Sequence, residues 1–181
     1  MRFKSNAMAW RPMTKTAPYL HWRRIPFGHT DAAAIVYTPR FSDYCMEAVE
    51  VWFRDCIGID WYRINTELGW GTPVVHMELD FKAPLKGGDR LGIVVRVAGI
   101  GRSTVTVALE GIRELSGESP LACEPRRMQA FSARFVFCFA KLGQGAIPVS
   151  QEQRALLEAY QQACEAAVSE AGSEFESLNV L

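Results

Sequence analysis

The chain has 181 residues, a length that suits one domain with a sizeable hydrophobic core. Apolar residues make up 49% of it, and 20 basic side chains balance 20 acidic ones. Because nucleic-acid binding depends on clustered basic residues, this balance argues against it. No apolar run reaches the roughly 18 residues of a membrane helix, so we expect neither nucleic acid nor a membrane as a partner.

The cysteines indicate a reducing compartment. Their number is five, which is odd, and no pair has the Cys-x-x-Cys spacing of a metal or redox site. The three histidines also lack the spacing of metal ligands. We therefore expect reduced thiols, a cytoplasmic location and no bound metal.

The first predicted elements are a short strand and a long helix. Residues 1–17 begin with basic residues and lack a continuous apolar segment, so we expect a flexible leader. Residues 19–26 alternate weakly and end at a proline, as in a short strand. From Pro39 to Gly58, apolar residues recur every three or four positions, which predicts a helix buried on much of its surface. This apolar stripe consists of Phe41, Tyr44, Cys45, Ala48, Val49, Trp52, Phe53 and Cys56.

Four predicted strands follow the helix. Their alternating patterns and the turn residues between them place them at 74–81, 91–97, 103–115 and 131–139, with a loop at 116–125. Strands joined by hairpin-length connections pair in antiparallel fashion. The order of elements therefore predicts an α+β fold with a mostly antiparallel sheet.

A second helix is predicted at the end of the chain. Ser150 and Gln153 have the spacing of a capping box, and small apolar residues recur on one face of the segment that follows. We expect a helix from Ser150 and a frayed tail after Gly172. The chain thus divides into a leader at 1–17, a domain at 18–147, and a C-terminal helix with its tail at 148–181.

The segment between the first strand and the long helix carries the strongest functional signal. Residues 27–37 read Phe-Gly-His-Thr-Asp-Ala-Ala-Ala-Ile-Val-Tyr, so Asp31 is the one acid in a loop of small residues. A carboxylate beside a helix N-terminus can form a catalytic pair, because the acid attacks or deprotonates while helix amides stabilise an anion. Capping a turn is the alternative role of Asp31.

Two segments resemble one known family. Residues 31–41 read Asp-Ala-Ala-Ala-Ile-Val-Tyr-Thr-Pro-Arg-Phe, and residues 71–75 read Gly-Thr-Pro-Val-Val before a strand that ends in Ala-Pro-Leu. Residues 18–142 are thereby similar to the hotdog-fold acyl-CoA thioesterases, specifically the 4-hydroxybenzoyl-CoA thioesterase family. The resemblance implies an antiparallel sheet wrapped around the long central helix, with the C-terminal helix as an extra element. Ala34 departs from the family, which usually has glycine there, and alanine disfavours a positive φ.

The resemblance implies that the loop around Asp31 catalyses thioester hydrolysis. Asp31 would act either as a nucleophile, through a mixed anhydride, or as a general base that activates water. Backbone N–H groups near Tyr37 and Thr38 would polarise the thioester carbonyl. His29 would orient Asp31 or assist proton transfer, and a loop histidine without a catalytic role is the alternative.

Three further residues are candidates for substrate binding. Glu47 on the predicted helix would be a second acid or an orienting group, and a salt bridge is its alternative role. In the family, basic residues near the hairpin at 99–102 meet the phosphates of coenzyme A, a role that Arg102 would fill with Ser103. The alternatives to Arg102 are Lys82, Lys86 and Arg90.

The expected activity is hydrolysis of an acyl- or aroyl-CoA thioester to the free acid and coenzyme A. The resemblance implies no cofactor, and a homodimer or homotetramer whose sites form between subunits. Acyl carrier protein in place of coenzyme A stays open. Two other functions also stay open: a hotdog hydratase or dehydratase, in which His29 or His76 would have to meet Glu47, and a non-catalytic acyl-binding domain.

Overall fold

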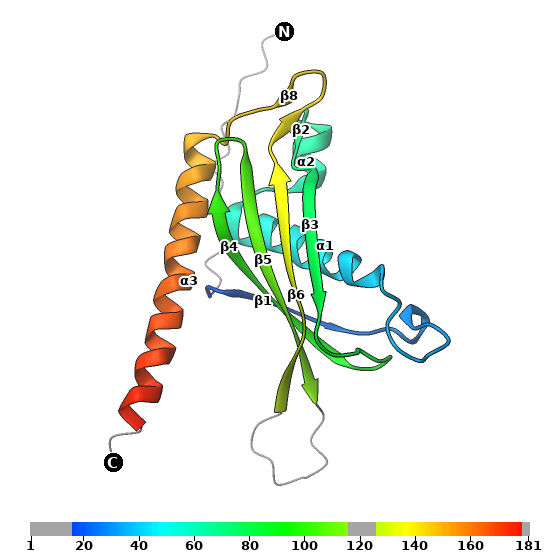
Figure 1. Cartoon of the computed structure of the whole chain (residues 1–181). Coiled ribbons are helices and arrows are strands. Elements are labelled where there is room, and N and C mark those ends of the chain that lie inside the picture. Colours follow the sequence, from blue (N-terminus) through cyan, green and yellow to red (C-terminus); the bar gives the residue numbers. More distant parts are fainter. Residues whose placement is uncertain (1–15, 116–125, 179–181) are drawn as a thin grey trace.

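A five-stranded antiparallel sheet packs with one face against a long helix, as expected (Figure 1). The computed structural model describes residues 16–115 and 126–178. The predicted leader up to residue 15 and the predicted loop at 116–125 lie outside these residues. The main elements are β1 (Tyr19–Arg24), α1 (Arg40–Trp52), β3 (Val74–Phe81), β4 (Arg90–Ile100), β5 (Thr104–Leu115), β6 (Arg126–Cys138) and α3 (Gln151–Leu178).

Helix α1 is the centre of the core. The apolar stripe predicted from the sequence is buried along its whole length. The helix continues into a π-helical turn, η2 (Phe53–Ile57), and ends at Gly58, which takes a φ of 76° that favours glycine. Rings on the sheet meet rings on the helix edge to face: Phe41 lies 5.5 Å from Phe131, and Phe53 lies 5.5 Å from Phe137. The sheet therefore wraps around α1 through interlocking aromatic contacts.

The order of the strands decides which segments meet at each end of the sheet. The order is β1-β4-β5-β6-β3, so β3 is an edge strand that pairs only with β6 within the described residues. Strand β1 ends where Arg24 pairs with Arg90 at the start of β4. The loop after β1 therefore begins at this end of the sheet. The β4–β5 hairpin lies at the opposite end, after the pair of Ile100 with Val105.

Helix α3 covers β4 beside the start of β1, where Tyr19 pairs with Val95 (Figure 1). The predicted capping box is confirmed, because the Ser150 and Gln153 side chains each bind the backbone N–H of the other residue, at 3.2 and 3.3 Å. The buried Tyr160 hydroxyl donates to the Val95 carbonyl and accepts the Tyr19 N–H, both at 2.7 Å. The expected fraying after Gly172 is wrong, since the helix runs to Leu178.

Four short elements were not predicted from the sequence. One is the helix α2 (Trp61–Thr66). The other three are the strands β2 (Trp70–Gly71), β7 (Ala140–Lys141) and β8 (Gly145–Ala146), and these strands form a small second sheet. Elements of two to six residues are too short to show a hydrophobic period. Asp60 caps α2 by accepting the Arg63 N–H at 3.0 Å.

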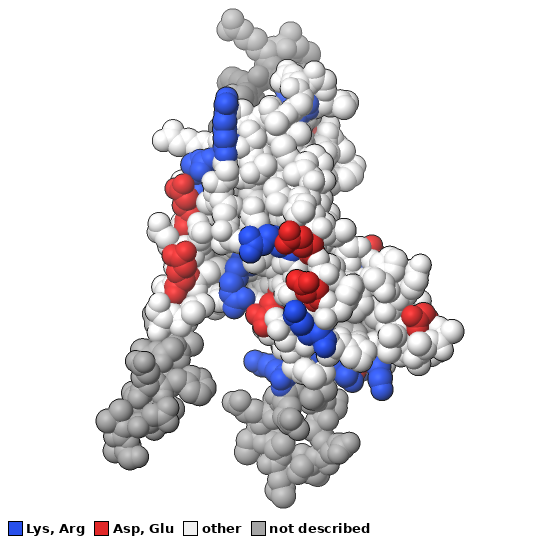
Figure 2. Space-filling model, in the orientation of Figure 1, with Lys and Arg blue, Asp and Glu red and all other residues white. Residues whose placement is uncertain are grey.

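The outer face of the sheet, turned away from α1, carries charges of both signs side by side (Figure 2). Arg90 lies 2.8 Å from Glu114, and Arg96 lies 3.5 Å from Glu110. In the part of the chain that the structure describes, no helix is long and apolar enough to cross a membrane.

Candidate active site

The loop that carries Asp31 is a small hairpin, which we call the Asp31 loop (residues 29–37). Three pairings hold its two sides together: Tyr37 N–H to the His29 carbonyl at 3.0 Å, a β-bridge between Thr30 and Val36, and Asp31 N–H to the Ile35 carbonyl at 2.9 Å. Asp31 itself lies near the tip and is exposed. The backbone therefore holds this carboxylate at a defined place in the loop that precedes α1.

The Asp31 side chain does cap a turn, as its alternative role required. Its Oδ1 accepts the Ala33 N–H at 2.8 Å. Among the described residues, Oδ2 has no hydrogen-bond partner, so one carboxylate oxygen can still reach a substrate or a water. The capping bond orients the carboxylate, and the two roles are compatible.

Ala34, where the resembling family usually has glycine, adopts a backbone conformation that favours glycine. Its φ is 59°, and it is the one non-glycine residue with positive φ in the described chain. Its N–H donates to the Asp31 carbonyl at 3.0 Å. The alanine therefore takes a left-handed conformation, at a cost of about 1 kcal/mol.

Of the two backbone amides expected to polarise a carbonyl, only one is free. The Tyr37 N–H is taken up by the His29 carbonyl. The Thr38 N–H has no acceptor within the described residues, and it lies two residues before α1, where the helix dipole favours negative charge. Thr38 thus keeps the predicted ability to bind an oxyanion, whereas the Tyr37 amide is occupied.

A cavity of about 290 Å³ lies next to the Thr38 end of the Asp31 loop. Its walls are mostly apolar and come from the loop, from Phe41 on α1, and from residues 81–85 at the end of β3. Lys82, one of the alternatives to Arg102, is the charged residue in its lining. The cavity can accept an apolar group close to the Thr38 amide.

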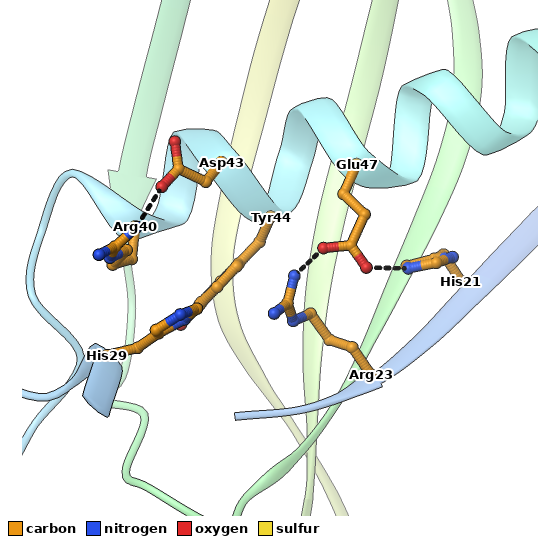
Figure 3. A network of polar contacts seen from close by, with 7 residues as sticks. All are labelled: His21, Arg23, His29, Arg40, Asp43, Tyr44 and Glu47. Atoms are coloured by element: carbon orange, nitrogen blue, oxygen red, sulfur yellow. Dashed lines mark hydrogen bonds and ion pairs between the residues drawn. The ribbon is translucent and has the colours of Figure 1, made fainter. Parts of the chain in front are cut away.

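A chain of polar contacts joins the Asp31 loop to β1 and α1 (Figure 3). The Nδ1 atom of His29 lies 2.9 Å from the hydroxyl of Tyr44. The Arg23 guanidinium lies 4.0 Å from the centre of the Tyr44 ring and also pairs with Glu47. Glu47 further contacts His21, at 3.2 Å. Glu47 therefore has the salt bridge that was its alternative role, and it makes no contact with His29.

The structure does not bring Arg102 and Ser103 to the Asp31 loop of the same chain. They follow β4 at the hairpin end of the sheet, whereas the Asp31 loop follows β1 at the other end. The carbonyls of Arg102 and Ser103 accept the backbone N–H groups of Val149 and Phe139, and the Arg102 side chain is exposed. Any contact of these two residues with the same substrate as Asp31 requires a second copy of the chain.

Two features of the site were missed by sequence reasoning. Tyr44 was predicted only as a core residue, because its place in the apolar stripe gives no sign of a polar partner on another element. A second cavity, of about 270 Å³, lies between Met46 of α1, Trp61 and residues 72–74. No sequence pattern marks it, because its walls come from three separate segments.

Within the described residues, no group of three or more acidic, His or Cys side chains is placed to hold a metal.

Comparison with known proteins agrees with this geometry. The family model of the thioesterase-like superfamily matches residues 25–157. A 1,4-dihydroxy-2-naphthoyl-CoA hydrolase of Synechococcus elongatus is 36% identical over 92 residues, which are 50% of this chain and 67% of that protein. A protein of the same name from Picosynechococcus is 37% identical over 78 residues, which are 41% of this chain and 51% of its own length.

Two solved structures are similar in fold. A 1,4-dihydroxy-2-naphthoyl-CoA thioesterase from Synechocystis has a TM-score of 0.64 and 22% identity, over 77% of this chain and 94% of that one. A 4-hydroxybenzoyl CoA thioesterase from Pseudomonas has a TM-score of 0.67 and 23% identity, over 76% of this chain and 97% of that one. These likenesses confirm the predicted hotdog fold.

Proposed function

We propose that this chain, which belongs to the thioesterase-like superfamily, hydrolyses an acyl- or aroyl-CoA thioester to the free acid and coenzyme A. The observation that carries the proposal is the Asp31 loop. It holds a carboxylate with one oxygen unpaired among the described residues, and its Ile35 and Val36 line the same apolar cavity as Thr38, whose N–H is free. The names of the matched relatives, which are CoA thioester hydrolases, support the same activity.

Two routes through Asp31 lead to the same products. As a nucleophile, the carboxylate attacks the thioester carbon, the thiolate of coenzyme A leaves, and water cleaves the resulting mixed anhydride. As a general base, Asp31 takes a proton from water, the hydroxide attacks the same carbon, and the proton passes to the leaving thiolate. In both routes the carbonyl oxygen becomes negative, and the Thr38 N–H would bind it, a contact worth roughly 3 kcal/mol.

We also propose that the protein is a homodimer or homotetramer in which two copies meet along β3. This edge strand exposes large apolar side chains, since Val75, Met77 and Phe81 are 59%, 50% and 51% accessible. A long apolar edge strand is a template for pairing with another chain. A two-fold axis makes such a pairing antiparallel, so the Val74 end of one strand lies beside the Phe81 end of the other.

This pairing would bring the second cavity of one copy to the Asp31 site of the other copy. The second cavity is the one lined by Met46, Trp61 and residues 72–74. That cavity adjoins the start of β3, and the cavity beside Thr38 adjoins the end of β3. Across the two-fold, the first cavity of one copy faces the second cavity of the other. We propose that the acyl group enters the second cavity while its thioester lies at Asp31.

The lining of the second cavity favours a ring that carries a polar substituent. The Trp61 Nε1 and Thr72 Oγ1 atoms are buried and have no hydrogen-bond partner among the described residues. Buried polar groups are normally paired, so a hydroxyl or carbonyl on the acyl group would satisfy them. A hydroxyaroyl-CoA meets this requirement, and the relatives named above are hydrolases or thioesterases of such compounds.

The coenzyme A end of the substrate would meet basic residues. Lys82 lines the cavity next to Thr38 and can reach a phosphate directly. Arg102 and Ser103 stay candidates only as residues of another copy. Acyl carrier protein stays open as the thiol carrier. A cytoplasmic location accords with the free thiols of Cys45, Cys138 and Cys164.

The two competing functions receive less support from the geometry. A hydratase would need a histidine beside Glu47. His29 binds Tyr44 instead, and His76 pairs with Glu78 at 3.0 Å on β3. His21 does touch Glu47, but this contact lies within the ion pair with Arg23, away from both cavities. A non-catalytic domain was favoured only if Ala34 closed the Asp31 loop, whereas Asp31 is exposed and its Oδ2 has no partner among the described residues.

The test is a free-thiol assay with benzoyl-, 4-hydroxybenzoyl-, 1,4-dihydroxy-2-naphthoyl- and fatty acyl-CoA, together with an enoyl-CoA. We expect thiol release, fastest with a hydroxyaroyl-CoA. Hydration of the enoyl-CoA without thiol release would favour the hydratase, and binding without turnover would favour the acyl-binding domain.

The proposed dimer is tested by light scattering. Met77→Lys should lower the measured mass, whereas Glu78→Lys, on the opposite face of β3, should not.

A further inference from the structure

Tyr44 is a buried polar residue that the proposed hydrolysis does not yet use. Its side chain is fully buried on α1. Its hydroxyl lies 2.9 Å from the Nδ1 atom of His29, which is 15 residues earlier in the chain and on another element. The two rings are nearly parallel, with an interplanar angle of 18° and centroids 5.7 Å apart. The bond therefore fixes the orientation of the His29 ring as well as its position.

The direction of this hydrogen bond sets the tautomer of His29. Burial raises the pKa of Tyr44, so the phenol keeps its proton at neutral pH. Within the described residues, His29 Nδ1 is the only acceptor for that proton, and a buried hydroxyl that fails to donate is costly. The hydroxyl must therefore donate to Nδ1. A ring nitrogen that accepts carries no proton, so the imidazole is neutral and carries its proton on Nε2.

The charged groups around the Tyr44 hydroxyl are paired with one another. The groups that act on its hydroxyl are Arg23 on β1 and Arg40, Asp43 and Glu47 on α1. The two carboxylates are already paired: Asp43 with Arg40 at 3.1 Å, and Glu47 with Arg23. The cation of Arg23, 4.0 Å from the ring centre, belongs to the same ion pair as Glu47 (Figure 3). These two ion pairs surround Tyr44 and leave its hydroxyl to bond with His29.

His29 is also the residue that closes the Asp31 loop. Its carbonyl accepts the Tyr37 N–H, the outermost of the three pairings in the loop. Its side chain ties this end of the loop to α1, because the ring reaches Tyr44 one turn into the helix. This contact adds to the bond between the Arg40 N–H and the Tyr37 carbonyl, at 2.9 Å. A change at the Tyr44 hydroxyl is thus passed through His29 to the base of the loop that positions Asp31.

We propose that Tyr44 is a positioning residue for the proposed hydrolysis: its hydroxyl holds His29 as the Nε2–H tautomer and thereby anchors the Asp31 loop to α1. The role of Tyr44 in catalysis rests on the proposed function. The tautomer does not, because it is argued from the burial of the Tyr44 hydroxyl and its hydrogen bond to His29. Tyr44 touches no substrate in this scheme and acts through His29.

The tautomer is tested without any turnover, by nitrogen-15 NMR of the histidine side chains at pH 7. The His29→Asn spectrum assigns the signals. We expect the shifts of a neutral His29 ring with Nδ1 unprotonated, and a loss of this pattern in Tyr44→Phe. A wild-type His29 protonated on Nδ1 would overturn the proposal, whether or not the protein releases thiol.

The positioning role is tested by kinetics once the wild type has shown thiol release. Tyr44→Phe keeps the ring and removes the hydroxyl. We expect kcat to fall about tenfold, which corresponds to about 1.4 kcal/mol, with KM within about twofold because substrate contacts are unchanged. Tyr62→Phe, on exposed α2, is the matched control and should match the wild type.

Two further comparisons of kcat distinguish a positioning role of Tyr44 from a role in packing alone: a conservative variant of His29 and a double variant. His29→Asn places an amide oxygen near the Nδ1 position and should recover most of the kcat lost in His29→Ala. The double variant Tyr44→Phe/His29→Ala should be no slower than His29→Ala alone. A Tyr44→Phe protein with a lower Tm and wild-type kcat would show a structural role only and overturn the proposal. If the losses of kcat in the two single variants add up in the double variant, the proposal is also overturned.

Discussion

Replacing Ala34 with glycine should stabilise the protein, although glycine usually destabilises. Ala34 has a φ of 59°, in the left-handed region where the Cβ of an L-residue crowds the following carbonyl. The Asp31 loop imposes this φ, because the Ala34 N–H is bound to the Asp31 carbonyl at 3.0 Å. Glycine has no Cβ and adopts the same φ without strain.

The expected gain follows from two opposing terms. A non-glycine residue in the left-handed region costs about 1–2 kcal/mol. Glycine makes the unfolded chain more flexible, which costs roughly 0.4–1 kcal/mol in return. The net gain is about 0.5–1 kcal/mol, and for a chain of this length it corresponds to a rise in Tm of about 1–4 °C.

The assay is thermal unfolding by calorimetry, with Ala32→Gly as the matched control. Ala32 lies in the same loop, is also exposed, and does not have a positive φ. We expect Ala34→Gly to raise Tm and Ala32→Gly to lower it. If both variants lose the same stability, the left-handed conformation at Ala34 is wrong, and the shape of the loop around Asp31 with it.

Three further predictions concern the scaffold of the site. Tyr160→Phe should lower the free energy of unfolding by about 2 kcal/mol in urea titrations, because it leaves two buried backbone groups unpaired. Gly111→Ala should cost about 1–3 kcal/mol, since a Cβ there would lie 2.1 Å from the ring of Phe131, and Phe131→Leu in the same chain should restore part of it. Burial raises the pKa of Cys45 from 9.0 to about 12. The folded state therefore loses stability as pH rises above 9, by up to about 1.4 kcal/mol per pH unit, and Cys45→Ala should show a shallower loss in unfolding titrations from pH 8 to 11.

The large elements could be predicted because their patterns are local. The apolar stripe of α1 repeats every three to four residues and is buried in full, and the bounds predicted for β3 are those observed. The conformation of Ala34 could not be predicted, because its φ is set by hydrogen bonds across the loop and opposes the preference of alanine.

The contacts of the candidate site were less accessible to sequence reasoning. Asp31 stood out because the whole signal lies within eleven neighbouring residues. The bonds of Tyr44 to His29 and of Arg23 to Glu47 join different elements. The hydrophobic period within one element does not predict such contacts. Arg102 stays a prediction: β4 carries it to the end of the sheet opposite the Asp31 loop of its own chain, and the sequence of one chain does not show how two copies would meet.

The most direct test of the account compares the wild type with Asp31→Asn on a hydroxyaroyl-CoA that the wild type hydrolyses. The amide keeps the shape of the side chain and can still accept the Ala33 N–H through its oxygen, but it neither attacks the thioester nor takes a proton from water. We expect substrate binding by calorimetry to stay within a few fold, while thiol release falls by at least about a thousandfold, or about 4 kcal/mol. Thiol release at a wild-type rate from a folded Asp31→Asn protein would contradict the central claim that Asp31 performs the hydrolysis.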